Sequence, residues 1–218
     1  ENTTVDQATN NPRVSVQEVY DLIMKDLNYA IELFETAGSN DGADKASIDV
    51  AVAYGLRARA NMLLGKYAEA ASDADKSLTL SGATPYTRTE VSVPSFNNDT
   101  HSWIWGAIIT SNNDVVTTGI INWPSHMSSL YTDGYTGVGT YREINSDLYS
   151  KISPTDVRKG WWLNENLEPP LLDHPAYAGW KGNGVPYANV KFGVPDDDMV
   201  NLVADADWTL MRYEEMLL

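Results

Sequence analysis

Apolar and small residues recur at helical spacing over residues 47–80, and a Gly-Lys-Tyr turn divides this stretch in two. Ser47 is the predicted N-cap of a first helix that ends at Gly65, and a second helix runs from Tyr67 to Gly82. The faces predicted to be buried are Ala51, Tyr54, Ala58 and Met62 on the first helix, then Ala70, Ala71, Ala74, Leu78 and Leu80 on the second. Small residues let helices approach closely. The pattern therefore predicts a packed helical hairpin.

Two further helices are expected near the ends of the chain. Ser15 and Glu18 form a capping box, which predicts a helix that starts at Val16 and ends before Gly38. Its apolar stripe consists of Val19, Leu22, Ile23, Leu27, Ala30, Ile31 and Phe34. Residues 208–218 show a helix-like pattern that stops within an apolar run, so we expect native sequence to follow Leu218.

The pattern of the sequence changes after residue 82, where the helical period ends. An apolar run at 103–109 predicts a buried strand, and a second short strand is expected at 187–192. Residues 110–146 hold Gly, Ser, Thr, Asn and aromatics without a sustained period, which is usual for a functional loop region. The predicted fold is mainly α, with a tetratricopeptide-like α-α superhelix core that carries a long loop-rich insertion with short β-strands. We interpret 1–218 as one domain, with a helical core at 14–82, an aromatic-rich, ligand-facing region at 83–205, and the start of another helix at 206–218.

Composition and charge exclude several classes of function. The net charge of -15 argues against nucleic acid as a partner, because such binding needs a basic surface. The absence of cysteine excludes disulfides, thiol catalysis and cysteine-based zinc sites. Seven Trp and twelve Tyr stand against three Phe, and Trp and Tyr combine a flat apolar face with a polar tip. This aromatic composition suits recognition surfaces.

No motif specifies catalysis, a cofactor or a metal. Pairs of carboxylates such as Glu165/Glu168 and Glu214/Glu215 have nothing that selects them for acid–base work on a glycoside. The three histidines are isolated, no phosphate-binding glycine loop occurs, and the acidic run at 196–198 lacks the ligand spacing of a calcium loop. We therefore expect a protein that is not an enzyme and needs no cofactor or metal, with a glycoside hydrolase as the weakest alternative.

The residues needed to bind a sugar do occur together. A flat aromatic side chain can stack on the C–H face of a sugar ring, while Asn, Asp or Arg bind its hydroxyls. Residues 110–146 offer both kinds of group, and core packing is the competing interpretation of each aromatic. The predicted stacking residues are Trp123, Tyr131 and Tyr135, with Trp161, Trp162 and Trp180 as second choice. Trp103 and Trp105 are assigned to a core or sheet face, and Arg158 and Arg212 to structural ion pairs.

Residues 53–80 resemble a tetratricopeptide repeat, whose period is about 34 residues. Four segments in a fixed order carry a more specific resemblance: Val19–Ala30, the 51–80 hairpin with its Gly-Lys-Tyr turn, Asp156-Val157-Arg158, and Ala206–Leu218. Their order resembles the SusD/RagB family of outer-membrane nutrient-binding lipoproteins. The lipidated N-terminal cysteine of that family is absent, so the chain is interpreted as an internal fragment.

The resemblance implies a function and a location. It implies non-catalytic, cell-surface binding of oligosaccharides, for delivery to a SusC-like TonB-dependent outer-membrane transporter. It also implies glycan contacts from the loops after the central repeat, and an outer-membrane lipoprotein of Bacteroidetes that meets the membrane only through a lipid anchor absent from this chain. A tetratricopeptide-type module that binds a protein or peptide, on a groove formed by residues 47–80, is the alternative.

Overall fold

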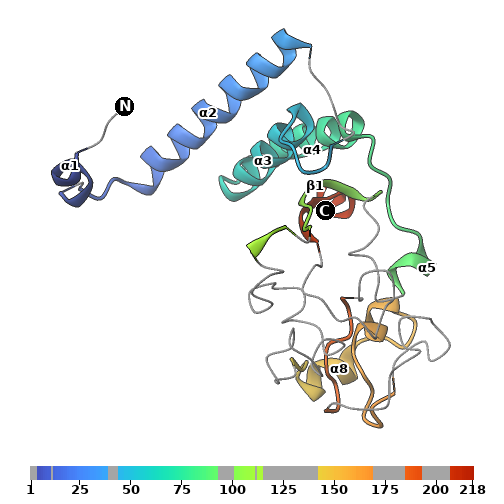
Figure 1. The fold of residues 1–218 in the computed structure, drawn as a ribbon. Helices are drawn as coiled ribbons and strands as arrows, with labels where there is room; N and C mark the ends of the chain where they lie inside the picture. Colours follow the sequence, from blue (N-terminus) through green and yellow to red (C-terminus); the bar gives the residue numbers. More distant parts are fainter. Residues whose placement is uncertain are drawn as a thin grey trace. The chain divides into compact units, whose positions relative to one another are not determined.

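The structure is a computed structural model that describes residues 4–10, 12–38, 44–92, 101–110, 112–114, 142–168, 185–192 and 207–218. Its helices are α1 (Val5–Thr9), α2 (Val16–Ala37), α3 (Val50–Leu63), α4 (Tyr67–Ser81), α5 (Arg88–Val91), α8 (Ser146–Lys151), the 3₁₀ helix η2 (Val157–Trp161) and α9 (Tyr213–Leu217). The strands are β1 (Trp103–Ala107) and β2 (Trp208–Arg212) (Figure 1). The prediction of a mainly helical chain with short strands is confirmed.

The chain forms two compact units. Residues 1–42 and 48–81 make the helical unit, and residues 43–47 and 82–218 make the mixed unit. Residues 43–47 belong to the mixed unit because the Gly106 N–H in β1 donates to the Lys45 carbonyl at 2.8 Å. The end of the first unit at residue 81 lies one residue before the predicted end of the helical core, and the interpretation of 1–218 as one domain stays a prediction.

In the helical unit, α2 begins and ends where the sequence predicts. The Ser15 hydroxyl accepts from the Glu18 N–H at 3.2 Å, and the Glu18 carboxylate accepts from the Ser15 N–H at 2.8 Å. Gly38 follows the helix with a φ of 64°, a left-handed conformation that glycine adopts without a steric penalty. Much of the predicted apolar stripe is not covered by the described residues, since Val19, Leu22 and Ile23 are exposed.

The N-cap of α3 is Asp49, so the prediction of Ser47 as the cap is wrong. The Asp49 carboxylate accepts from the Val52 N–H at 2.9 Å, and a negative charge at a helix N-terminus also interacts favourably with the helix dipole. The Ser47 hydroxyl instead donates to Asp44 at 2.5 Å. Two candidate caps lay two residues apart, and the charged one caps the helix.

The contact of α4 with α3 is more polar than predicted. The buried positions of α4 are Ala70, Asp73, Ser77 and Ser81, whereas Ala71 is exposed. A small apolar cluster lies beside this polar contact and consists of Ile31, Val50, Ala53 and Tyr54, with Phe34 and Leu80 packed against it. The helices therefore pack through small side chains and one buried charged group, Asp73.

Asp73 is the centre of a hydrogen-bond network that joins the three long helices. Its carboxylate accepts from the Arg57 guanidinium at 2.8 and 2.6 Å and from the Asn61 amide at 2.9 Å. Arg57 also donates to the Asn28 amide oxygen of α2 at 2.8 Å. Because Asp73 is 4% exposed, its charge needs these partners, and the network fixes how α2, α3 and α4 pack together.

In the mixed unit, β1 and β2 pair antiparallel, from Trp103 opposite Arg212 to Ala107 opposite Trp208. The expected helix over residues 208–218 is therefore wrong for its first five residues, and only 213–217 is helical. Pairing with β1 decides the conformation, because the strand buries Met211, which is 1% exposed. Trp103 is fully buried and Trp105 is half-buried. The strand predicted from the apolar run at 103–109 is confirmed and spans 103–107. The second predicted strand, at 187–192, is found only as isolated bridges at Ala188 and Asn189.

Candidate functional site

The predicted stacking residues fall into two groups. Trp161 and Trp162 lie in the part of the chain that the structure describes. The other four lie outside the described residues and stay predictions: Trp123, Tyr131, Tyr135 and Trp180. The described candidate site is therefore the aromatic cluster around η2, which we define by Tyr149, Trp161, Trp162, Tyr187 and Phe192.

Trp161 is held in place by backbone hydrogen bonds and by a lysine that lies over its ring. Its indole N–H donates to the Val91 carbonyl at 2.8 Å, and its own carbonyl accepts from the Val190 N–H at 2.8 Å. The Lys191 ammonium lies over its ring, 4.8 Å from the centroid, and also lies 5.2 Å from the centroid of Phe192. A sugar that stacks on this face of Trp161 would have to displace the lysine. These contacts favour a structural role for Trp161, and its stacking role stays a prediction.

Trp162 has a different environment. Its backbone forms a bridge with Asn189, and the N–H of the next residue, the fully buried Leu163, donates to the Ala188 carbonyl at 2.9 Å. The half-buried indole of Trp162 makes no ring or cation–π contact with the described residues. Of the two described candidates, Trp162 therefore has the ring that is better placed to receive a ligand.

The tyrosines of the cluster are packed against each other and against a second lysine. The ring centroids of Tyr149 and Tyr187 lie 5.0 Å apart, and the Lys159 ammonium lies 4.8 Å from the centroid of Tyr149. Burial raises the pKa of Tyr149, with a smaller contribution from nearby Tyr187. Tyr187 has a φ of 66°, which a tyrosine rarely adopts, and its carbonyl accepts from the Ile144 N–H at 3.1 Å. The cluster is thus a tightly organised body that connects segments distant in the sequence.

Burial also lowers the pKa of Lys191. Desolvation between the rings, together with the nearby Arg212 charge, lowers the pKa of Lys191 from 10.5 to about 8. The amine is consequently easier to deprotonate than an ordinary surface lysine. At Asp156 the charged form is favoured instead, because hydrogen bonds from Arg158 lower the pKa of the carboxyl group to about 2. The ion pair between these two residues, at 2.7 Å, agrees with the structural role predicted for Arg158.

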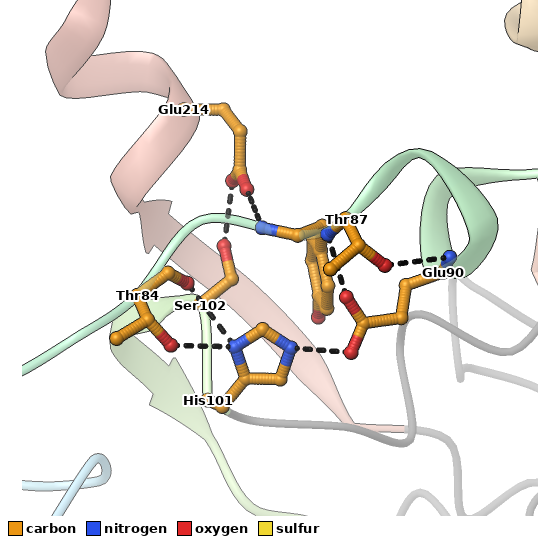
Figure 2. Close-up of polar contacts among 7 residues, drawn as sticks. Thr84, Thr87, Glu90, His101, Ser102 and Glu214 are labelled. Carbon is orange, nitrogen blue, oxygen red and sulfur yellow. Dashed lines mark hydrogen bonds and ion pairs between the residues drawn. The ribbon is translucent and has the colours of Figure 1, made fainter.

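A polar network fastens the start of β1 to neighbouring segments. Figure 2 shows the His101 imidazole between Thr84, at 3.0 Å, and the Glu90 carboxylate, also at 3.0 Å. Glu90 also accepts from the Thr87 N–H at 2.6 Å, and hydrogen bonds from Thr87 lower its pKa. In the same view the Glu214 carboxylate accepts from the Ser102 hydroxyl at 2.6 Å.

This network contains Ser, His and Glu but is not arranged for acyl transfer. A nucleophilic serine needs its hydroxyl on the imidazole, with the imidazole oriented by the carboxylate. Here the Ser102 hydroxyl is fully buried and donates to Glu214, while His101 contacts Glu90. Among the residues described, no group of three or more His, Cys, Asp or Glu side chains could hold a metal ion.

The helical unit carries a polar groove that the sequence patterns did not predict. It has a volume of about 670 Å³ and lies along α2 beside the turn between α3 and α4. Its lining residues are Gln17, Asp21, Met24, Lys25, Asn28, Tyr29, Glu32, Leu64 and Lys66. The signal in the sequence was the row Gln17, Asp21, Lys25 and Glu32, spaced by one or two helical turns, which resembles an ordinary solvated helix face.

Comparison with known proteins identifies the fold. The chain superposes on the crystal structure of a SusD-like carbohydrate binding protein from Bacteroides vulgatus ATCC 8482 with a TM-score of 0.66 and 23% sequence identity. The match covers 98% of this chain and 40% of that chain. The fold is SusD-like. No protein-family model matches the sequence, and no curated protein matches it either.

The SusD-like fold confirms the architecture that the sequence resemblance implied. At 23% identity the likeness establishes the fold, and this chain spans 40% of the length of the protein it matches. No helix in the described ranges is both long and apolar enough to cross a membrane.

Proposed function

We propose that the chain is a glycan-binding protein without catalytic activity. Three observations support this function: the SusD-like fold, the carbohydrate binding named for its structural relative, and the surplus of Trp and Tyr over Phe. The fold carries the most weight, since the aromatics alone are equally compatible with core packing. The serine and histidine next to β1 contact different carboxylates, which further favours binding over acyl transfer.

The mechanism is reversible stacking and hydrogen bonding. A Trp or Tyr ring covers the apolar face of a sugar, and neighbouring amides and carboxylates bind the hydroxyls. The proposed stacking residues are Trp123, Tyr131 and Tyr135, with Trp162 favoured among the second choices because no described ring or lysine covers its indole. The backbone contacts on either side of Trp162 hold this part of the chain in place before a ligand arrives, and such preorganisation reduces the entropy lost on binding.

The finer parts of the proposal follow from the family resemblance. The binder sits on the outer membrane as a cell-surface lipoprotein of a Bacteroidetes species and passes the oligosaccharide to a SusC-like TonB-dependent transporter. The hairpin of residues 47–80 holds the protein together and faces that transporter, while the aromatic loops after Leu80 meet the glycan. Nucleic acid is not a partner, given the net charge of -15.

Calorimetry against plant, host and microbial oligosaccharides tests the proposed function. We expect one class of glycan to bind, and Trp123→Ala to weaken that binding at least about tenfold, as for a central aromatic contact. Tyr67→Ala is the matched control, because Tyr67 is 71% exposed in the helical unit and lies outside the proposed loops. Absence of heat with every glycan would reject the function, and full affinity in the Trp123 variant would reject the lead residue.

The second candidate is a module that binds a peptide on the helical unit. The polar groove along α2 is the observation in its favour, although residues 47–80 contribute only Leu64 and Lys66 to the lining. Short peptides belong in the same calorimetric panel. Heat with peptides and none with glycans would establish this alternative.

A further inference from the structure

The groove along α2 is a concave site made of polar, charged and aromatic side chains. Tyr29 lies in its lining with 61% of its surface exposed, and Met24 and Leu64 contribute apolar side chains to the same lining. Around them lie the donors and acceptors of six further residues: Gln17, Asp21, Lys25, Asn28, Glu32 and Lys66. An apolar platform with surrounding polar groups is the arrangement that receives a small ring-shaped polar ligand.

Two of these polar side chains are held in place by neighbours. The Asn28 amide oxygen accepts from Arg57 at 2.8 Å, which directs the remaining amide N–H groups to other partners. One oxygen of Asp21 accepts from the Gln17 amide at 2.8 Å, so its second oxygen remains an acceptor. Arg57 is itself fixed by the buried Asp73. The groove therefore presents an oriented donor and an oriented acceptor before any ligand arrives.

The charge of the groove differs from that of the chain as a whole. The chain has 30 acidic and 15 basic residues, whereas the groove is lined by two acids, Asp21 and Glu32, and two lysines, Lys25 and Lys66. Both lysines are exposed, and neither forms an ion pair with the described residues. Two unpaired ammonium groups at one groove form a local site for an anion on an otherwise acidic protein.

We propose that this groove binds an acidic sugar, a uronate residue within a longer oligosaccharide. The sugar carboxylate pairs with Lys25 and Lys66, its apolar ring face lies on Tyr29, and its hydroxyls bind Asn28 and Asp21. Two simpler ligands fit the groove less well. A neutral sugar provides no negative charge for Lys25 and Lys66, and a simple carboxylic acid provides no hydroxyls for the Asn28 amide and the Asp21 carboxylate. The inference rests on the proposed glycan binding and adds to it a second contact, on the helical unit.

Calorimetry with uronate oligosaccharides tests the inference directly. The probes are tetragalacturonate, a mannuronate tetramer and a hyaluronan tetrasaccharide, and fully methyl-esterified tetragalacturonate is the uncharged match of the first. We expect a uronate to bind more tightly than its ester. The combined variant Lys25→Gln/Lys66→Gln should lose about tenfold in affinity for the uronate, the size of one charge-assisted hydrogen bond, and should not change binding of the ester.

Controls separate the groove from general surface effects. Lys151→Gln removes an exposed lysine elsewhere, and Tyr67→Ala removes an exposed tyrosine of the same unit, so both should bind uronate as the parent chain does. Tyr29→Ala should weaken both the uronate and its ester. Raising the salt concentration shortens the range of charge interactions and should weaken only the uronate.

Each alternative result overturns the inference. A neutral glycan that binds while all three uronates fail leaves the proposed function standing and rejects an acidic-sugar groove, and failure of every glycan rejects both. Uronate binding that survives in the double lysine variant places the contact elsewhere. If hexaglutamate binds in a lysine-dependent manner while the uronates do not, the groove is a peptide site.

Discussion

Asp73→Ala should strongly destabilise the helical unit, because Asp73 is the shared acceptor of the network between its long helices. The substitution removes three hydrogen bonds, two from Arg57 and one from Asn61. It also leaves the Arg57 guanidinium, which is 19% exposed, with the Asn28 oxygen as its one remaining hydrogen-bond acceptor among the described residues and with the Tyr54 ring 5.1 Å away. Most of the loss in folding stability arises because the Arg57 charge stays partly buried without a counter-charge, and less arises from the lost attraction between Arg57 and Asp73.

The magnitude follows from burial. Removing one member of a buried ion pair costs about 3 to 5 kcal/mol. Arg57 keeps some solvent and one hydrogen bond, so we expect about 3 kcal/mol for Asp73→Ala. A domain is commonly stable by about 5 to 15 kcal/mol, so this loss would remove a large part of the stability of the helical unit.

Urea unfolding followed by circular dichroism at 222 nm measures this effect. The long helices α2, α3 and α4 dominate that signal, while all seven tryptophans lie in the mixed unit and report it by fluorescence. The free energy of unfolding of a small protein falls by about 1 to 3 kcal/mol per molar urea. We therefore expect the midpoint of the circular dichroism transition to lie at least about 1 M lower in urea for Asp73→Ala than for the parent chain.

Asp75→Ala is the matched control, because Asp75 is an exposed aspartate of the same helix. Its midpoint should stay within experimental error of the parent chain. Arg57→Met combined with Asp73→Ala should recover part of the loss, since it removes the uncompensated charge. Equal midpoints for Asp73→Ala and Asp75→Ala would refute the reasoning that the buried network holds the helices together.

The remaining predictions concern the mixed unit. Gly106→Ala should cost about 1 to 3 kcal/mol and broaden the near-ultraviolet spectrum, because a Cβ would lie 2.6 Å from an atom of the buried Trp103 ring; an unchanged thermal midpoint would contradict this. Glu214→Ala should lower stability by about 2 to 3 kcal/mol in urea unfolding, because the Tyr86 N–H and the buried Ser102 hydroxyl lose their acceptor; Glu165→Ala, at an exposed glutamate of the same unit, serves as control. For Lys191 the folded pKa of about 8 lies below 10.5, so the unfolded chain binds the extra proton between these values and stability rises with pH there. Lys191→Met should lack that rise, which is at most about 3 kcal/mol, and identical pH profiles would show that the amine is not desolvated.

The helices of the first unit were readable from local signals. A capping box, a glycine with positive φ at each helix end, and a helical apolar period act within a few residues, and α2 and the hairpin follow them closely. The cap at Asp49 was missed because Ser47, two residues earlier, is also a residue type that caps helices. The buried Asp73 was missed because an aspartate within a helix is normally exposed, and its partner Arg57 lies 16 residues away.

Long-range pairing explains the other differences. Residues 208–212 have an ambiguous short apolar pattern, and only their partner strand, about a hundred residues earlier, makes them a strand. The contact of Lys191 with the Trp161 ring could not be predicted from the sequence either, because the two residues are 30 positions apart. Composition predicted an aromatic surface, and the three-dimensional contacts determine which rings are already occupied.

Hydrogen exchange with and without a bound glycan is the most direct test of the central claim. The ligand is the neutral oligosaccharide that gives the largest heat in calorimetry, at a saturating concentration. Glycan binding through the aromatic loops predicts slower exchange in peptides from residues 110–146, with no change in residues 67–81. Protection confined to residues 50–81, or none anywhere in the chain, would contradict glycan capture by these loops.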